Sequence, residues 1–194
     1  MSERGGGILR HTTATLFAAT AIALSSMAAG PASAQEQPEA NAPGDIPDSQ
    51  AFITYTSPAG FSIKVPEGWA RTERPDGASF ADKYGSVDIS VVHAAGAPTL
   101  KQASKEEAAR LAKSGHAVRI SAIHRVTLPA GPAMQIVYTS DSQPNAVTDK
   151  QIRLENNCYL LEQAGREAAL TFSAPAGADN ADQWQLMARS FRWN

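Results

Sequence analysis

The chain has 194 residues, 43% of them hydrophobic, and a formal net charge of −2. Neither charge sign forms a long run, which argues against a nucleic-acid partner. The single cysteine, Cys158, excludes an intramolecular disulfide and a thiolate-rich zinc site. A lone thiol of this kind is usually buried and inert, and the alternative is a reactive thiol or an intermolecular bridge.

The N-terminal segment has the pattern of a secretory signal peptide. Arg4 and Arg10 form a basic start, a moderately apolar stretch follows, and Ala32-Ser33-Ala34 supplies the small residues that signal peptidase requires. Residues 1–34 are therefore predicted to be a signal peptide that is cleaved after Ala34. The mature protein is expected to be periplasmic or secreted, without stable membrane insertion, because the apolar stretch is short and contains Thr and Ser.

Residues 35–50 are rich in Pro, Gln, Glu and Ala and contain one large apolar side chain, Ile46. Such a stretch cannot bury enough surface to offset its ordering entropy. It is predicted to be a disordered linker, and the folded domain is expected to span residues 51–194.

The domain is predicted to open with a β-hairpin that leads to a tryptophan. Strands FITYT (52–56) and FSIKV (61–65) flank a Ser-Pro-Ala-Gly turn. Pro66 ends the second strand because it has no N–H to donate. Gly68 then lets the backbone turn, so that Trp69 can fold back and cap one end of the core.

The middle of the chain is predicted to contain a second hairpin and a helix. Strands over residues 79–84 and 86–94 join through Gly85, and the later strand alternates apolar and polar residues. The helix is expected within 97–115. Its start is marked by Pro98-Thr99 or, one turn later, by a Ser104-x-x-Glu107 capping box.

Four further strands are predicted between this helix and the C-terminal region. In residues 118–128 the even-numbered residues are apolar except His124 and are expected to share one face, and the next strand covers 133–139. The last pair turns at Ala164-Gly165. A change of apolar parity before this turn predicts a bulge at Asn156-Asn157. The turn would pair apolar residues across the two strands: Leu161 with Ala168 and Tyr159 with Leu170.

The chain is predicted to close with an amphipathic helix, with Asn180 and Gln183 as a capping-box-like start. Strands dominate the whole domain, and two helices accompany them, so the predicted fold class is α+β. The tryptophans are expected to be core anchors. The apolar stripe of the closing helix has the spacing i, i+3, i+4, i+7: Trp184, Met187, Ala188 and Phe191.

Three stretches resemble the PsbP-like family, which has the Mog1/PsbP fold. GFSIKVPEGW (60–69) is similar to the opening strand and turn of that family, and LTFSAP (170–175) and SFRW (190–193) are similar to its closing elements. The resemblance covers residues 51–194 and identifies the chain as a bacterial exported member. It implies an antiparallel β-sheet flanked by helices on both faces, a Mog1/PsbP-like α/β/α sandwich.

The family includes photosystem II subunits, a Ran-binding factor, envelope lipoproteins and effector chaperones, so the fold does not fix a function. What these proteins share is binding or stabilising a partner. The resemblance thus implies an exported, non-catalytic accessory or binding protein that contacts an unidentified envelope protein. The alternatives are an exported metal- or small-ligand-binding module and, third, a hydrolase.

Local motifs do not indicate an enzyme. The sequence has no Gly-x-Ser-x-Gly elbow, His-Glu-x-x-His, Cys-x-x-Cys, Walker loop or Rossmann fingerprint. No catalytic residue, cofactor or cofactor-binding residue is therefore predicted.

Two histidines are the weak candidates for a metal site. His93 and His124 continue the apolar parity of their strands and are expected to be core or strand-end histidines that bond a neighbour. The alternative is a shared metal or pH-sensitive site to which Asp82 or Asp88 supplies a further ligand. The parity of Asp88 counts against it, and His116 is expected in solvent.

Overall fold

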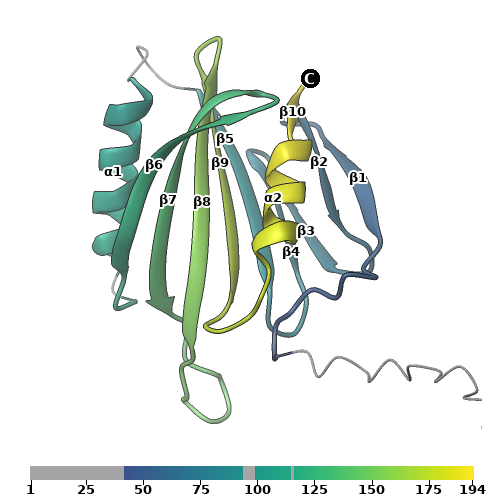
Figure 1. The fold of residues 1–194 in the computed structure, drawn as a ribbon, viewed down its shortest axis with the longest axis vertical. Helices are drawn as coiled ribbons and strands as arrows, with labels where there is room; N and C mark the ends of the chain where they lie inside the picture. The colour runs from purple at the N-terminus through teal and green to yellow at the C-terminus, as the bar shows by residue number, and fades with distance from the viewer. Residues whose placement is uncertain (1–41, 94–98, 115) are drawn as a thin grey trace, which may run out of the picture. The chain divides into compact units, whose positions relative to one another are not determined.

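The computed structural model describes residues 42–93, 99–114 and 116–194; the predicted signal peptide and its cleavage site lie outside them. The described chain forms two antiparallel sheets, one with the strand order β3-β4-β5-β9-β8-β7-β6 and one with the order β1-β2-β10, together with two helices (Figure 1). The predicted β-rich α+β class is confirmed. In chain order the elements are β1 (Phe52–Ser57), β2 (Phe61–Pro66), β3 (Ala70–Arg74), β4 (Gly77–Ala81), β5 (Ser86–His93), α1 (Leu100–Ala112), β6 (Arg119–Leu128), β7 (Gly131–Asp141), β8 (Arg153–Gln163), β9 (Arg166–Pro175), α2 (Ala181–Ser190) and β10 (Arg192–Trp193).

Within the described part of the chain, neither helix combines the length and the apolar character needed to cross a membrane.

The first hairpin belongs to a sheet of its own, whereas the sequence predicted a single sheet. β2 pairs with β1 on one side and with β10 on the other, where Arg192 lies opposite Ser62. β10 has only two residues, which is too short for an alternating pattern to predict a strand. Its pairing with β2 joins the two ends of the domain. β3 was not predicted either, because its side chains are polar or small and almost all of them are exposed.

The tryptophans next to these elements contribute to the core, as expected. Trp69 is half-buried against the main core. A Cβ atom at Gly85 would lie 2.8 Å from the Cη2 atom of Trp69, so a glycine there lets the indole lie directly on the backbone. Trp193 packs edge-on against Phe191, with 5.1 Å between the ring centroids.

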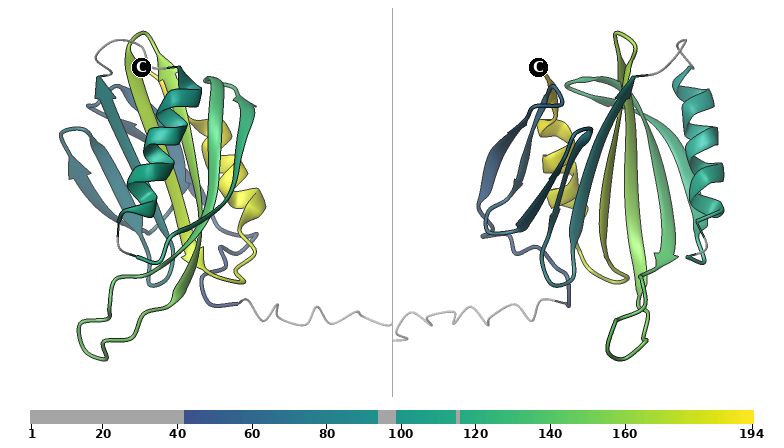
Figure 2. Two further views of the ribbon diagram at one scale, coloured as in Figure 1. Left: turned by 90° about the vertical axis from the view of Figure 1, so that its left-hand side faces the viewer. Right: turned by 180° about the vertical axis from the view of Figure 1, so that it is seen from behind.

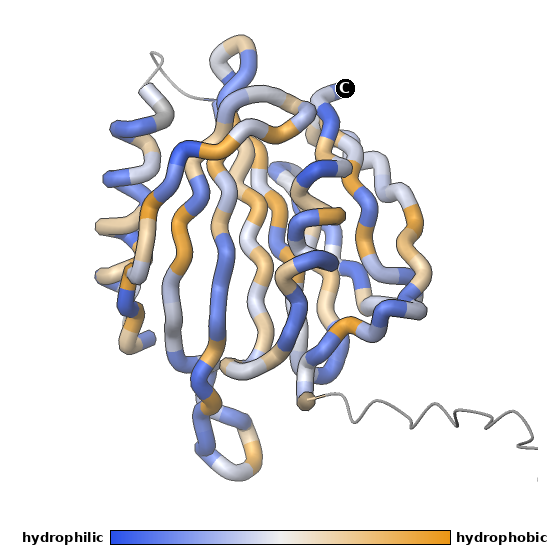
Figure 3. Tube along the Cα trace, viewed as in Figure 1, coloured by the Kyte–Doolittle hydropathy of each residue, from blue (hydrophilic) through white to orange (hydrophobic). Residues whose placement is uncertain are grey.

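The main core lies between α2, the small sheet and one face of the large sheet. Hydrophobic and hydrophilic residues alternate along the strands that surround it (Figure 3). The predicted stripe of α2 faces this core: Trp184, Met187, Ala188 and Phe191 are all buried.

A second cluster of buried residues lies beneath α1, which packs beside β6, β7 and β8 (Figure 2). Cys158 and Leu160 of β8 belong to this cluster, whereas Tyr159 and Leu161 belong to the main core. β8 is therefore buried on both faces. This explains the change of apolar parity without a bulge: the predicted bulge at Asn156-Asn157 is wrong, since the pairing of β8 with both neighbours is continuous there.

The bulge of this sheet lies in β6. Ile120 and Ala122 pair with adjacent residues of β7, so Ser121 is an extra residue. Before the bulge, Val118 and Ile120 pack in the cluster beneath α1; after it, Leu128 packs in the main core. The prediction that even-numbered residues share one face along the whole strand is therefore wrong.

The pairing of β8 with β9 agrees with the prediction. The strands turn at Ala164-Gly165, where both residues have positive φ angles of 51° and 74°. Leu161 lies opposite Ala168, and Tyr159 lies opposite Leu170.

α1 begins at the earlier of its two predicted starts. The Thr99 side chain accepts a hydrogen bond from the Gln102 backbone N–H (3.3 Å), and the Gln102 side chain accepts one from the Thr99 backbone N–H (2.9 Å). The Ser104–Glu107 capping box is wrong, because Ser104 lies inside the helix and donates to the Lys101 carbonyl.

Residues 42–50 pack against the domain, so the disordered-linker prediction is wrong for this part. Ile46 is 5% exposed, and its backbone N–H donates to the Asn180 side chain (2.6 Å). The Asn180 amide in turn donates to the Gly44 carbonyl (2.8 Å). Because the Asn180 side chain bonds this segment, it makes no capping hydrogen bond with α2. The predicted capping-box-like start with Gln183 is therefore wrong.

Candidate functional site

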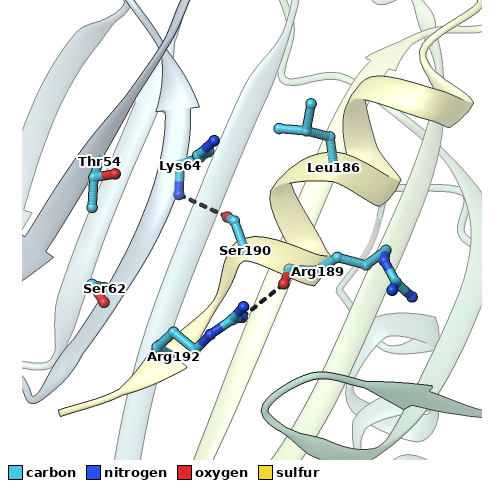
Figure 4. Close-up of a pocket in the computed structure, with 7 residues that line it drawn as sticks. All are labelled: Thr54, Ser62, Lys64, Leu186, Arg189, Ser190 and Arg192. Carbon is cyan, nitrogen blue, oxygen red and sulfur yellow. Dashed lines mark hydrogen bonds between the residues drawn. The ribbon is translucent and has the colours of Figure 1, made fainter.

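An open groove of about 480 Å³ lies where β1 and β2, β10 and the C-terminal half of α2 meet (Figure 4). We call it the basic groove, because three of its lining residues are cationic and none is acidic. Its lining residues are Thr54, Ser62, Lys64, Leu186, Arg189, Ser190 and Arg192.

The alternation of the small sheet places polar side chains on this groove. Thr54 lies opposite Lys64 on neighbouring strands, and Arg192 lies opposite Ser62. Residues paired in this way direct their side chains to the same face. The residues between them on β2, such as Ile63, are buried in the core. One hairpin thus forms both a piece of the core and the floor of the groove.

A hydrogen bond through Ser190 attaches α2 to this floor. The Ser190 Oγ atom accepts from the Lys64 backbone N–H (2.8 Å; Figure 4). It also donates to the Met187 carbonyl (2.6 Å). With Met187 buried, the opposite side of the helix faces outward, and Leu186 is left 42% exposed at the edge of the groove.

The Arg192 guanidinium closes the C-terminal end of α2. Its Nη1 atom donates to the carbonyls of Arg189 (2.8 Å) and Phe191 (2.7 Å). A cation at this position also complements the negative end of the helix dipole. The Arg189 side chain is exposed and extends away from Arg192 (Figure 4). None of the three cations of the groove forms an ion pair with a described residue.

Arg189 also borders a second groove, of about 320 Å³, on the other side of α2. The floor of this groove is polar: the Gln135 amide donates to Asn157 (3.0 Å) and to the Tyr159 hydroxyl (3.0 Å). Burial raises the pKa of Tyr159, so this phenol stays neutral at physiological pH.

An open pocket of about 280 Å³, which we call the α1 pocket, lies near the C-terminal end of α1 and combines apolar and polar lining residues. Asn156, 3% exposed, accepts from the Ser173 hydroxyl (2.6 Å) and donates to the Ser140 hydroxyl (3.1 Å). His116, expected in solvent, is half-buried here, with its Nε2 atom 2.9 Å from the Gln143 amide nitrogen. The sequence showed no sign of this pocket, because its residues come from four separate segments.

The two candidate metal-binding histidines do not meet. His93 and His124 are both exposed and lie on β5 and β6, which β9, β8 and β7 separate in the large sheet. Four strand spacings amount to roughly 19 Å. Neither histidine is in the core, which corrects that half of the expectation. His93 is the last residue of β5, which agrees with the strand-end alternative, whereas His124 lies in the middle of β6.

The two aspartates considered as further ligands already have other roles. The Arg74 guanidinium donates to both carboxylate oxygens of Asp88 (2.9 and 3.1 Å). Asp82 accepts from the Tyr84 backbone N–H (2.8 Å) in the turn between β4 and β5. Among the residues that the structure describes, no group of three or more His, Cys, Asp or Glu side chains is arranged to hold a metal ion.

Cys158 is fully buried on β8. Burial raises the pKa of its thiol to about 12, with a smaller opposing effect from a hydrogen bond with Thr171. The neutral thiol behaves as a small apolar side chain in the cluster beneath α1.

The sheet topology and the two helices define the class of this protein as the Mog1/PsbP-like fold. A solution structure of the cyanobacterial PsbP protein CyanoP from Synechocystis sp. PCC 6803 superposes with a TM-score of 0.55 at 13% identity, covering 78% of this chain and 98% of that one. The Ran-binding protein Mog1p of Saccharomyces cerevisiae superposes with a TM-score of 0.53 at 12% identity, covering 75% and 96%. The predicted resemblance is confirmed at the level of the fold.

The chain belongs to the serine/threonine kinase C-terminal domain family, whose profile matches residues 54–192. The sequence contains neither the His-Arg-Asp nor the Asp-Phe-Gly motif of a kinase catalytic domain. The matched family is the C-terminal domain and not the kinase catalytic domain. A comparison with curated proteins found no match.

Proposed function

We propose that this chain is a non-catalytic accessory protein that binds a partner protein through the basic groove. The observation that carries the proposal is the set of three cations, Lys64, Arg189 and Arg192, which line one open groove without an acidic residue. Surface cations outside functional sites are usually interspersed with acidic residues, so an unbalanced set in a groove favours binding.

The remaining groups of the groove support binding over catalysis. Both of its serine hydroxyls are already engaged, since Ser62 bonds the Asn194 side chain (3.2 Å) and Ser190 donates to a backbone carbonyl. Among the described residues, no histidine or carboxylate that could act as a general base lines the groove. The family description, a serine/threonine kinase C-terminal domain, also supports a role outside a kinase catalytic domain.

Export and an envelope partner form the second part of the proposal. The basic start, apolar stretch and Ala32-Ser33-Ala34 pattern support a signal peptide that directs the mature chain to the periplasm or the exterior. The proposed domain is the α/β/α sandwich of the PsbP-like family, with helices on both faces. The alternating burial of Cys158 and Tyr159, one toward each hydrophobic cluster, supports this arrangement.

Site-specific photo-crosslinking tests the binding surface. A photo-reactive amino acid replaces Leu186 at the edge of the basic groove, and the matched control carries it at Val147, which is 92% exposed on the loop between β7 and β8. In cells that make the protein, we expect a crosslinked protein adduct from position 186 and none from position 147. Equal adducts from both positions, or an adduct from position 147 alone, would contradict the proposal.

The α1 pocket supports one alternative, a small-ligand-binding module. Its lining combines hydroxyl and amide groups of Ser140 and Asn156 with apolar walls such as Leu111, a mixture typical of small-molecule sites. Ligand-observed NMR with a library of small polar compounds tests this alternative. Binding that is lost in Ser140→Val would favour it, and the absence of any hit would reject it.

A further inference from the structure

We propose that the segment recognised by the basic groove is an acidic peptide that also carries an apolar residue. This inference rests on the proposed function, because it names the chemistry of the partner at the same groove. The three cations supply the charge, and the exposed side chain of Leu186 supplies an apolar wall.

Several arginines elsewhere in the described chain have acidic partners, in contrast to the cations of the groove. Arg74 pairs with Asp88 (2.9 Å) and Arg153 with Asp141 (2.9 Å), and Arg110 pairs with Glu107. The chain as a whole carries a net charge of −2, so the groove is a local positive region on an acidic protein. Charge complementarity therefore favours an acidic partner and disfavours a basic one.

The geometry of Arg192 adds a preformed binding group. The hydrogen bonds from its Nη1 atom to two carbonyls hold the guanidinium at the end of α2. Its Nε and Nη2 atoms make no hydrogen bond with the described residues and can donate to a carboxylate. An arginine that is already ordered loses less side-chain entropy on binding than a free one.

The size and composition of the groove favour a peptide over nucleic acid. Nucleic-acid sites extend a basic stripe over many phosphates, whereas here three cations are confined to one groove of about 480 Å³. Asp182, on the same helix as Arg189, would repel a phosphate backbone that continued past the groove. A short segment with a few carboxylates meets the cations without this repulsion.

Fluorescence anisotropy with two designed peptides tests the inference. One labelled peptide alternates Glu and Ser around a central Leu, and its twin has Gln in place of every Glu. We expect the mature protein to bind the Glu peptide, to lose affinity as salt is added, and to bind the Gln twin far more weakly. Replacing both Lys64→Gln and Arg189→Gln should weaken binding of the Glu peptide about fivefold.

The matched control is Arg119→Gln with Arg125→Gln, which removes the same charge from two exposed residues of β6, on the large sheet. It should change the affinity less than about twofold, because neither arginine lines the groove. Arg192 is left intact, because it also caps α2.

Two results would overturn the inference: equal binding of the Glu and Gln peptides, or equal weakening by the groove and control variants. Phosphatidylglycerol vesicles and inorganic phosphate are tested in parallel. If either binds in a manner that depends on Lys64 and Arg189 while the Glu peptide does not, the partner is not an acidic peptide. Failure of the peptide together with a crosslink at Leu186 overturns only this inference, and failure of the crosslink overturns the proposed function itself.

Discussion

Glu167 lies among other carboxylates on the side of the large sheet that α1 covers. It stands directly opposite Glu162 in the pairing of β8 with β9. Burial raises the pKa of Glu167, and the nearby charges of Glu107, Glu106 and Glu162 raise it further. Carboxylates thus gather around Glu167 at this position, whereas three cations line the groove beside α2.

Glu167→Gln is expected to stabilise the protein at neutral pH. A folded-state pKa above the unfolded value means that folding favours the protonated form, and this contribution is lost as the pH rises through the folded pKa. At pH 7 the charged Glu167 is therefore destabilising, and its replacement should raise the free energy of unfolding by roughly 0.5 kcal/mol. Thermal unfolding at pH 7 and at pH 4 measures the effect.

The control for this experiment is Glu155→Gln, which changes an exposed carboxylate on the same strand as Glu162. It should leave the melting temperature unchanged at both pH values. The explanation fails if Glu167→Gln destabilises the protein at pH 7, or if the gain is as large at pH 4, where the native glutamate is mostly protonated.

Elements whose signals are local could be predicted from the sequence. The Ser-Pro-Ala-Gly turn, the stop at Pro66, the Ala164-Gly165 turn and the buried stripe of α2 depend on neighbouring residues, and the structure contains each of them. β10 and the order of the strands could not be predicted, since they depend on pairings between residues far apart in the sequence, such as Ser62 with Arg192 and Val87 with Phe172. The basic groove was missed for the same reason.

β6 shows how a single residue can mislead pattern analysis. Alternation predicts one face for residues of one parity, but the extra residue Ser121 moves the later half of the strand to the other face. No turn residue or parity break marks this position, because His124 and Ala122 are compatible with either face. His124, which was chosen by parity, was affected by this error, whereas His93 lies on β5, whose printed pairings are continuous.

Deletion of Ser121 should be tolerated. Ile120 and Ala122 already pair with adjacent residues of β7, so removal of the bulge residue leaves regular alternation and keeps every other side chain on its present face. Deletion of His124, which is exposed and contributes no buried surface, should instead turn one half of β6 to the wrong face. Chemical unfolding of the two deletion variants compares them.

We expect the deletion of Ser121 to change the free energy of unfolding by less than about 1 kcal/mol and the deletion of His124 to cost more than about 2 kcal/mol, as for the loss of a buried apolar side chain. Equal losses of unfolding free energy in the two variants would contradict this explanation, because they would show that the bulge itself stabilises β6.

At the scale of the whole molecule, residues 42–50 extend the domain beyond the boundary that composition suggested. Low hydrophobicity argued for disorder, but one apolar residue, Ile46, and a few polar contacts are sufficient to hold the segment. Gln183 of α2 also donates to Asp48 (3.0 Å). The segment thereby joins the start of the domain to the helix that borders the basic groove.

A chain that begins at Gln50 should be less stable than one that begins at Ala42. It loses the buried side chain of Ile46, worth about 2 kcal/mol, and leaves the buried amide of Asn180 without its partners, at roughly 1 kcal/mol or more. Urea unfolding should show a loss of about 2–4 kcal/mol. Ile46→Ala in the longer chain should reproduce part of it. Equal stability of the two chains would mean that the segment is only loosely attached.

The central claim, that the basic groove is the surface through which this protein binds its partner, is tested most directly by hydrogen–deuterium exchange. The mature protein is measured alone and with the partner identified by the Leu186 crosslink. We predict slower exchange in β2, in the C-terminal half of α2 and in β10, with no change in α1 or β6. Slower exchange confined to α1 and the residues of the α1 pocket, with β2 and α2 unchanged, would contradict the claim.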